Sequence, residues 1–166
     1  MSEPARKPAA RVLTRSDAET LALGGRLAAT YEPDRHGALR LYLSGELGAG
    51  KTTLTRGFLR ALGVSQAVRS PTYALLEEYA TTKGMILHAD FYRLSGAADL
   101  ESLGLADYDR PGALWIVEWP EQASPGLPPA DIALHWRTHS DMREVHIEAC
   151  TEAGEGWARR LEAALR

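Results

Sequence analysis

The sequence is short of cysteine and has no long apolar run. Cys150 is the only cysteine among 166 residues, which excludes an intrachain disulfide and fits a reducing compartment. We expect its thiol to fill space in a strand. No stretch approaches the roughly 18 apolar residues of a membrane-spanning helix, and residues 1–13 lack the apolar centre of a signal peptide. We therefore expect a cytoplasmic protein without a membrane partner.

The chain also lacks the basic excess of a protein that binds nucleic acid by itself. Its formal net charge is -3 and its pI is about 6.0, whereas contacts to a phosphate backbone require many Lys and Arg side chains. If RNA takes part in the function, we expect another protein to hold it.

Helix-like and strand-like patterns alternate along the chain, which is typical of an α/β fold. The predicted strands cover residues 11–14, 38–45, 72–79, 85–92, 113–121, 127–136 and 143–150. The predicted helices cover residues 16–30, 52–62, 95–105 and 156–166. Residues 80–84 join two strands as an antiparallel hairpin. We predict a mixed, partly antiparallel sheet in a single domain at residues 11–166, after a disordered tail at residues 1–10.

A glycine-rich loop directly follows the apolar strand at residues 38–45. Gly45, four further residues, and then Gly50, Lys51 and Thr52 match the P-loop pattern, with a strand before and a helix after. Glycines let the backbone N–H groups point at phosphate oxygens, and the helix N-terminus adds its positive dipole end. We expect Lys51 to bridge phosphates and Thr52 to ligate Mg²⁺. The predicted nucleotide-binding loop is Gly45, Glu46, Leu47, Gly48, Ala49, Gly50, Lys51, Thr52 and Thr53.

Two apolar strands end in acids that could serve the metal and the attacking water. Glu118 follows five apolar residues, which is the Walker B form with Glu in place of Asp, and Asp90 ends another strand. Neither strand by itself decides which acid holds the metal. We assign Glu118 to Mg²⁺ together with Thr52, because its strand has the stronger Walker B form, and Asp90 to positioning the attacking water.

Residues near these acids give weaker signals. His88 alternates with Asp90 and Tyr92, so the three share a strand face, and we expect His88 to orient Asp90. Arg93 fits a partner of phosphate or carboxylate and equally a solvated side chain. Trp119 fits packing near the nucleotide and, equally, simple packing.

Residues 70–73 (SPTY) lie where a P-loop protein carries its first switch segment. The hydroxyl of Thr72 is then placed to reach Mg²⁺ or the γ-phosphate, although an ordinary turn also fits these four residues. Trp115 lies inside the strand that ends at Glu118, and we expect it in the core.

Four segments together resemble one protein family. They are GELGAGKTT at residues 45–53, SPTY at 70–73, HADFYR at 88–93 and VEWPE at 117–121. In this order and spacing they resemble the TsaE (YjeE) family, small bacterial P-loop ATPases of tRNA threonylcarbamoyladenosine synthesis, over residues 16–134. The resemblance implies a three-layer, P-loop NTPase-like α/β domain that uses ATP and Mg²⁺ and hydrolyses ATP slowly when alone.

The resemblance also implies partners and roles for individual residues. The family acts with TsaD and TsaB, which transfer the threonylcarbamoyl group to adenosine 37 of tRNA, so its contact with tRNA is indirect. ATP would drive or reset the complex of these partners. Carried over to this sequence, Lys51 would hold the phosphates, and Thr52 with Glu118 would hold Mg²⁺. Asp90 would be needed for hydrolysis, and Thr72 would be the switch threonine.

Other functions compete with this interpretation. A GTPase needs an Asn-Lys-x-Asp guanine reader, which the sequence lacks, and DRPG at residues 109–112 precedes a strand, so we interpret it as a turn. A small-molecule kinase needs an arginine-rich lid, and the arginines outside the apolar segments are too sparse for one. A nucleotide-gated binding module would bind ATP with incidental hydrolysis. The presence of both Asp90 and Glu118 argues against binding alone.

Overall fold

The computed structural model describes residues 9–71 and 73–166. The predicted N-terminal tail therefore falls mostly outside the described residues, as does Thr72. The first strand, β1, runs over Ala10–Thr14, one residue earlier than expected, and the backbone N–H of Ala9 already donates to the carbonyl of Ile147 at 2.7 Å.

In the described part of the chain, seven strands form one mixed sheet in the order β1-β7-β6-β2-β5-β4-β3. Strands β6, β2, β5 and β4 run parallel, whereas β1 with β7, β7 with β6, and β3 with β4 are antiparallel pairs. This confirms the predicted mixed sheet. The strands after β1 are β2 Leu39–Ser44, β3 Leu76–Thr81, β4 Gly84–Asp90, β5 Leu114–Glu118, β6 Ile132–His139 and β7 Met142–Ala149.

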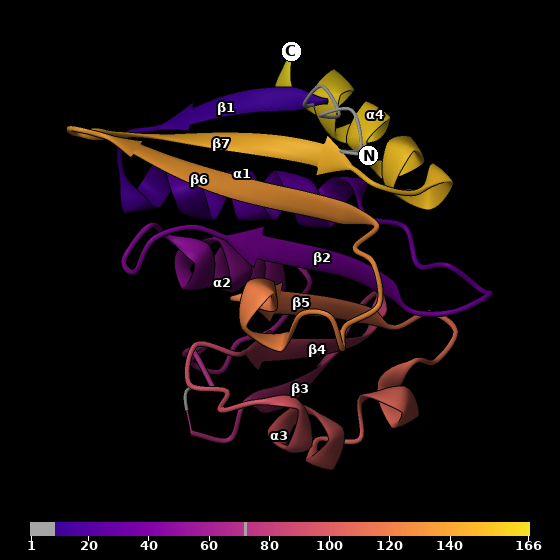
Figure 1. Cartoon of the computed structure of the whole chain (residues 1–166). Coiled ribbons are helices and arrows are strands. Elements are labelled where there is room, and N and C mark those ends of the chain that lie inside the picture. Colours follow the sequence, from indigo (N-terminus) through magenta and orange to yellow (C-terminus); the bar gives the residue numbers. More distant parts are fainter. Residues whose placement is uncertain (1–8, 72) are drawn as a thin grey trace, which may run out of the picture.

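Helices lie on both faces of this sheet and give the three layers of the fold (Figure 1). One face is covered by α1 (Asp17–Thr30), α2 (Lys51–Ala61) and α4 (Glu152–Leu165). The other face carries the short α3 (Ala97–Ser102) and the 3₁₀ turns η1 (Leu105–Tyr108) and η2 (Pro120–Ala123). Within the described residues, each helix is too short or too polar to cross a lipid bilayer.

The central strand β2 is rich in apolar residues, with Arg40 as its one charged residue, because core side chains cover both of its faces. Leu41 and Leu43 point into the cluster below α1, α2 and α4, and Tyr42 points into the cluster on the opposite face. A sequence rich in apolar residues is typical of a parallel strand that is covered on both sides. Trp115 of β5 is 1% exposed, which confirms its predicted place in the core.

Helices α1 and α2 touch through two glycines. A Cβ atom on Gly24 would lie 2.2 Å from the carbonyl oxygen of Leu54, and one on Gly57 would lie 2.2 Å from the carbonyl oxygen of Leu21. No side chain fits at that distance, so the two backbones meet directly. This contact fixes the start of α2, and with it the glycine loop, against α1.

Several predicted boundaries shift for local reasons. The strand predicted from residue 72 begins at Leu76, after a turn in which Leu75 has a φ of 64°. The strand predicted to residue 121 stops at Glu118, because Trp119 takes the left-handed conformation at a φ of 58°. The last helix begins four residues earlier than expected, at Glu152, where the Thr151 hydroxyl caps the Gly154 N–H at 3.1 Å.

Candidate functional site

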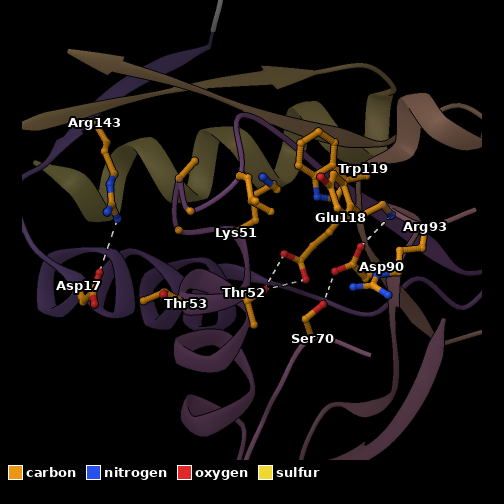
Figure 2. Close-up of a pocket in the computed structure, with 15 residues that line it drawn as sticks. Asp17, Lys51, Thr52, Thr53, Ser70, Asp90, Arg93, Glu118, Trp119 and Arg143 are labelled. Carbon is orange, nitrogen blue, oxygen red and sulfur yellow. Dashed lines mark hydrogen bonds and ion pairs between the residues drawn. The ribbon is translucent and has the colours of Figure 1, made fainter. Parts of the chain in front are cut away.

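A pocket of about 510 Å³ opens where the parallel strands β2, β5 and β4 end (Figure 2). The last residues of β4 and β5, Asp90 and Glu118, are direct partners in the sheet register. Because the carboxyl ends of parallel strands meet at one edge, both acids reach the loop that follows β2. Residues 47–53 of that loop and of α2 line the same pocket. The fold therefore brings the predicted loop and both predicted acids together.

The glycine loop passes directly into α2 through unusual backbone conformations. Gly48 has a φ of 77° and Gly50, the residue before the helix, a φ of 114°. No side chain of the described residues caps this helix N-terminus. The first N–H groups of any α-helix lack intrahelical partners, so the amides at Lys51 and the residues after it are donors for an anion in the pocket. Gly45 is required for packing, since a Cβ there would lie 2.7 Å from Cβ of Trp136.

Lys51 places a buried positive charge at the mouth of the loop. Its side chain Nζ donates to the carbonyl oxygens of Gly45 at 2.6 Å and Glu46 at 2.8 Å, and it lies 4.2 Å from the centre of the Trp119 ring. Burial lowers the pKa of Lys51, while the negative charges of Glu118, Glu121 and Asp90 oppose that shift. The ammonium group is thus held by weak acceptors that an anion can replace.

Glu118 is held by hydrogen bonds from two sides. The Thr52 hydroxyl donates to Glu118 Oε1 at 2.8 Å, and His88 Nε2 lies 2.7 Å from Glu118 Oε2. His88 is 0% and Glu118 2% exposed, so water does not compete for this contact. His88 Nδ1 has no partner among the described residues, so the histidine meets the site through Nε2 alone.

The expectation that His88 orients Asp90 was wrong. Both residues share a face of β4, as predicted, but His88 reaches across to the neighbouring strand β5 and contacts Glu118. Asp90 instead accepts hydrogen bonds from the backbone N–H of Tyr92 at 2.9 Å and from the Ser70 hydroxyl. Residues two apart on one strand point the same way, yet the side chains they bond are commonly on the adjacent strand.

Ser70 is a pocket residue that sequence reasoning missed. It belongs to the SPTY segment, in which the sequence pattern indicates the hydroxyl of Thr72. Thr72 lies outside the described residues, and its role stays a prediction. With Asp90 only 7% exposed, the two hydrogen bonds from Ser70 and Tyr92 fix its carboxylate at the pocket wall.

Aromatic and basic side chains complete the wall beside the acids. The Trp119 ring lies 4.9 Å from the Tyr92 ring and faces the pocket with Lys51, so it packs and lines the site at once. Arg93 also lines the pocket, and its guanidinium lies 5.1 Å from the centre of the Tyr73 ring. Two further lining residues, Asp17 and Arg143, come from α1 and β7 and were not predicted.

The oxygen atoms around Thr52 suit a hard cation such as Mg²⁺. A threonine hydroxyl has one donor and two acceptor lone pairs, and here the donor is used on Glu118, which leaves the oxygen lone pairs for a metal. Among the described residues, no group of three or more His, Cys, Asp or Glu side chains is arranged to hold a metal. A Mg²⁺ ion bound with a nucleotide needs only one or two carboxylates from the protein, since phosphates and water complete its shell.

The parallel strands, the glycine loop between β2 and α2, and the helices on both faces define a P-loop NTPase-like three-layer α/β domain. Residues 14–145 match the family described as "Threonylcarbamoyl adenosine biosynthesis protein TsaE", and this chain belongs to that family.

Similar proteins agree with this assignment. The chain is 43% identical over 118 residues to the tRNA threonylcarbamoyladenosine biosynthesis protein TsaE of Haemophilus influenzae, a match that covers 71% of this chain and 75% of that protein. It is 36% identical to the protein of the same name from Bacillus subtilis, over 66% of this chain and 68% of that protein. The crystal structure of Bacillus subtilis YdiB superposes with a TM-score of 0.77 at 29% identity, over 95% of this chain and 96% of the other.

Proposed function

We propose that this protein is a Mg²⁺-dependent ATPase that acts in the synthesis of threonylcarbamoyladenosine in tRNA. One observation carries the chemical part of the proposal. Lys51, the Thr52–Glu118 pair and Asp90 converge on one pocket at the start of α2. The membership of the TsaE family supports the pathway, because its relatives are named for that synthesis.

The phosphate and metal groups have separate places in the pocket. The amides at the start of α2 and the ammonium group of Lys51 bind the phosphates, with Lys51 exchanging its loop carbonyls for phosphate oxygens. Thr52 and Glu118 would hold Mg²⁺, which when bound neutralises charge on the β- and γ-phosphates. His88 keeps the Glu118 carboxylate in place from behind.

Asp90 is the residue of this pocket that suits the attacking water. Its carboxylate is fixed by Ser70 and by the Tyr92 amide, and it stands beside Glu118 at the end of the neighbouring strand. A carboxylate so fixed can accept a hydrogen bond from water and align it with a γ-phosphate. Preorganised positioning of this kind provides most of the catalysis in phosphoryl transfer, where the protein does little covalent chemistry.

Binding of a fluorescent ATP analogue and phosphate release test the chemical part. We expect Lys51→Ala to lose binding, because a preorganised site gives up several kcal/mol with that charge. Lys83→Ala is a matched control, since Lys83 also donates to backbone carbonyls, at 2.9 Å to Ala28, outside the pocket. Wild-type ATP affinity in a folded Lys51→Ala protein would exclude the phosphate role.

The two acids should fail differently in the same assays. We expect Glu118→Ala to raise the Mg²⁺ concentration needed for hydrolysis. Asp90→Ala should lower turnover by ~10²–10⁴-fold while nucleotide still binds, as expected for loss of a general base or water-positioning group. Rescue of Asp90→Ala, but not of Glu118→Ala, by added Mg²⁺ would show that their roles are exchanged.

We also propose that the protein acts with TsaD-like and TsaB-like partners, and this part of the proposal rests on the family resemblance. The predicted motifs of this chain are all assigned to a nucleotide and its metal, which suits a protein whose ATP cycle acts on a partner. By linkage, a partner that prefers the ATP-bound form also tightens ATP binding, with a typical coupling of about 5–150-fold. Calorimetry with the purified partner pair, in an ATP analogue and in ADP, measures that ratio. Equal affinities would remove the switch role and leave the ATPase.

A further inference from the structure

Two charged residues from distant parts of the chain close one end of the pocket. Arg143, near the start of β7, and Asp17, the first residue of α1, approach to 3.5 Å between Arg143 Nη1 and Asp17 Oδ1. The guanidinium lies over the glycine loop, since Arg143 Nη1 is 3.1 Å from where a Cβ of Gly50 would stand. Sheet register fixes the position of Arg143, which pairs with Thr14 of β1.

The pocket has a direction that follows from its other residues. Figure 2 shows Glu118 and Asp90 on one side of Lys51, and Thr53, Asp17 and Arg143 on the other. Mg²⁺ in P-loop sites bridges the β- and γ-phosphates, so the Thr52–Glu118 pair marks the end of the triphosphate that is remote from the sugar. The nucleoside must therefore lie toward the opposite end, beside Arg143 and Asp17.

The chemistry of this pair suits a ribose and a base. A guanidinium group is planar and stacks on aromatic rings, which an ammonium group does not do. The side chain of Arg143 is 31% exposed, so part of it remains accessible from the pocket, while Asp17 holds it from the side. The carboxylate of Asp17, 77% exposed, has acceptor positions left for a hydroxyl or amino group.

We propose that Arg143, oriented by Asp17, binds the nucleoside part of the nucleotide by stacking its guanidinium on the base. This inference rests on the proposed nucleotide binding and extends it, because it assigns the base-contacting end of the site to β7 and α1. Asp17 is then a positioning residue for Arg143.

Inorganic triphosphate is the probe that separates the two ends of the site, because it has the phosphates of ATP and no nucleoside. Calorimetry should measure the affinities of ATP and triphosphate for the wild type and for Arg143→Lys, which keeps the positive charge but lacks the planar guanidinium group. We expect ATP affinity to fall about 2- to 5-fold, the lower range of a cation–π contact, because the lysine ammonium retains part of the attraction to the base; triphosphate affinity should be unchanged. Arg137→Lys on β6, outside the pocket, is the matched control and should change neither.

Asp17→Asn should change the binding of triphosphate and of ATP in opposite directions. Removing a negative charge beside the phosphate loop should leave triphosphate binding unchanged or tighter. ATP binding should nevertheless weaken, because Arg143 loses the partner that orients it. A role of Asp17 in general electrostatics alone predicts that both ligands bind more tightly.

Each outcome decides the proposal. Equal ATP affinity in wild type and Arg143→Lys, or an equal loss for ATP and triphosphate, would overturn the base contact while leaving the phosphate site in place. A wild-type protein that binds neither ligand would remove the proposed nucleotide binding together with this inference. Loss of ATP affinity alone in Arg143→Lys would support it.

Discussion

Replacing His88 should weaken Mg²⁺ binding at the proposed metal site, although His88 is not itself one of the proposed metal ligands. His88 is fully buried, and its Nε2 lies 2.7 Å from Glu118 Oε2. In His88→Ala the carboxylate keeps Thr52 as a partner but loses the support that fixes it from β4. In His88→Gln an amide N–H can take the place of Nε2–H, so the conservative variant should recover most of the effect.

The size of the effect follows from the kind of contact. A distance of 2.7 Å is in the range of charge-assisted hydrogen bonds, and a hydrogen bond to a charged group is worth about 1.5–3 kcal/mol. Water that enters the space left by the imidazole would recover part of this energy. We therefore expect the half-saturating Mg²⁺ concentration to rise about 10–100-fold in His88→Ala, as for other residues that support metal ligands.

The assay must separate this effect from loss of structure. Phosphate release is measured against Mg²⁺ concentration, and ATP binding is measured without Mg²⁺ in parallel; we expect only the former to change strongly. His135→Ala is the matched control, since His135 also faces a glutamate, Glu148 at 3.6 Å, but on an exposed surface. A folded His88→Ala protein with the wild-type Mg²⁺ requirement would refute the reasoning, as would a His88→Gln protein no better than His88→Ala.

Two predictions concern folding stability. Gly57→Ala should lower the free energy of unfolding in urea by about 1–3 kcal/mol or more, because its Cβ would lie 2.2 Å from the Leu21 carbonyl oxygen. Gly25→Ala, whose Cβ would have its nearest neighbour at 4.0 Å, should raise the free energy of unfolding by up to about 1 kcal/mol. Equal effects of the two substitutions would contradict the close helix contact. The hydrogen bond from His146 lowers the pKa of Glu144 below its ordinary 4.5, so the ionised form stabilises the fold above that pH and the stabilisation is lost as the pH falls through the lowered pKa. We therefore expect the melting temperature of Glu144→Gln to fall less than that of the wild type when the pH is lowered from neutral to about pH 3. An equal fall in the two proteins would contradict this.

The parts of the site that could be predicted are those that lie within a few residues of one another. A strand, a glycine loop and a helix follow in sequence, so the pattern from Gly45 to Thr52 contains its own context. Glu118 and Asp90 could be predicted as neighbours because each ends an apolar strand, and the ends of parallel strands meet. Their ligand roles stay predictions until nucleotide and metal are measured.

The parts that were missed depend on contacts between distant segments. Arg143 and Asp17 are separated by most of the chain and meet only because β7 pairs with β1, which leads into α1. The partner of His88 was wrongly predicted for a related reason. The period of a strand gives the face on which a side chain lies, but only the order of the strands in the sheet decides which carboxylate is within reach.

The two halves of the sheet serve different ends of the pocket. The parallel strands β2, β5 and β4 supply the loop and both acids, to which we assign the phosphates and the metal. The antiparallel strands β7 and β1 bring Arg143 to the other end and lead into α1, which carries Asp17. Helix α1 is in turn locked to α2 through Gly24 and Gly57, and α2 begins at Lys51. A change at that helix contact would move the two ends of the pocket relative to each other. It should therefore impair ATP binding more than the binding of triphosphate, which spans only one end.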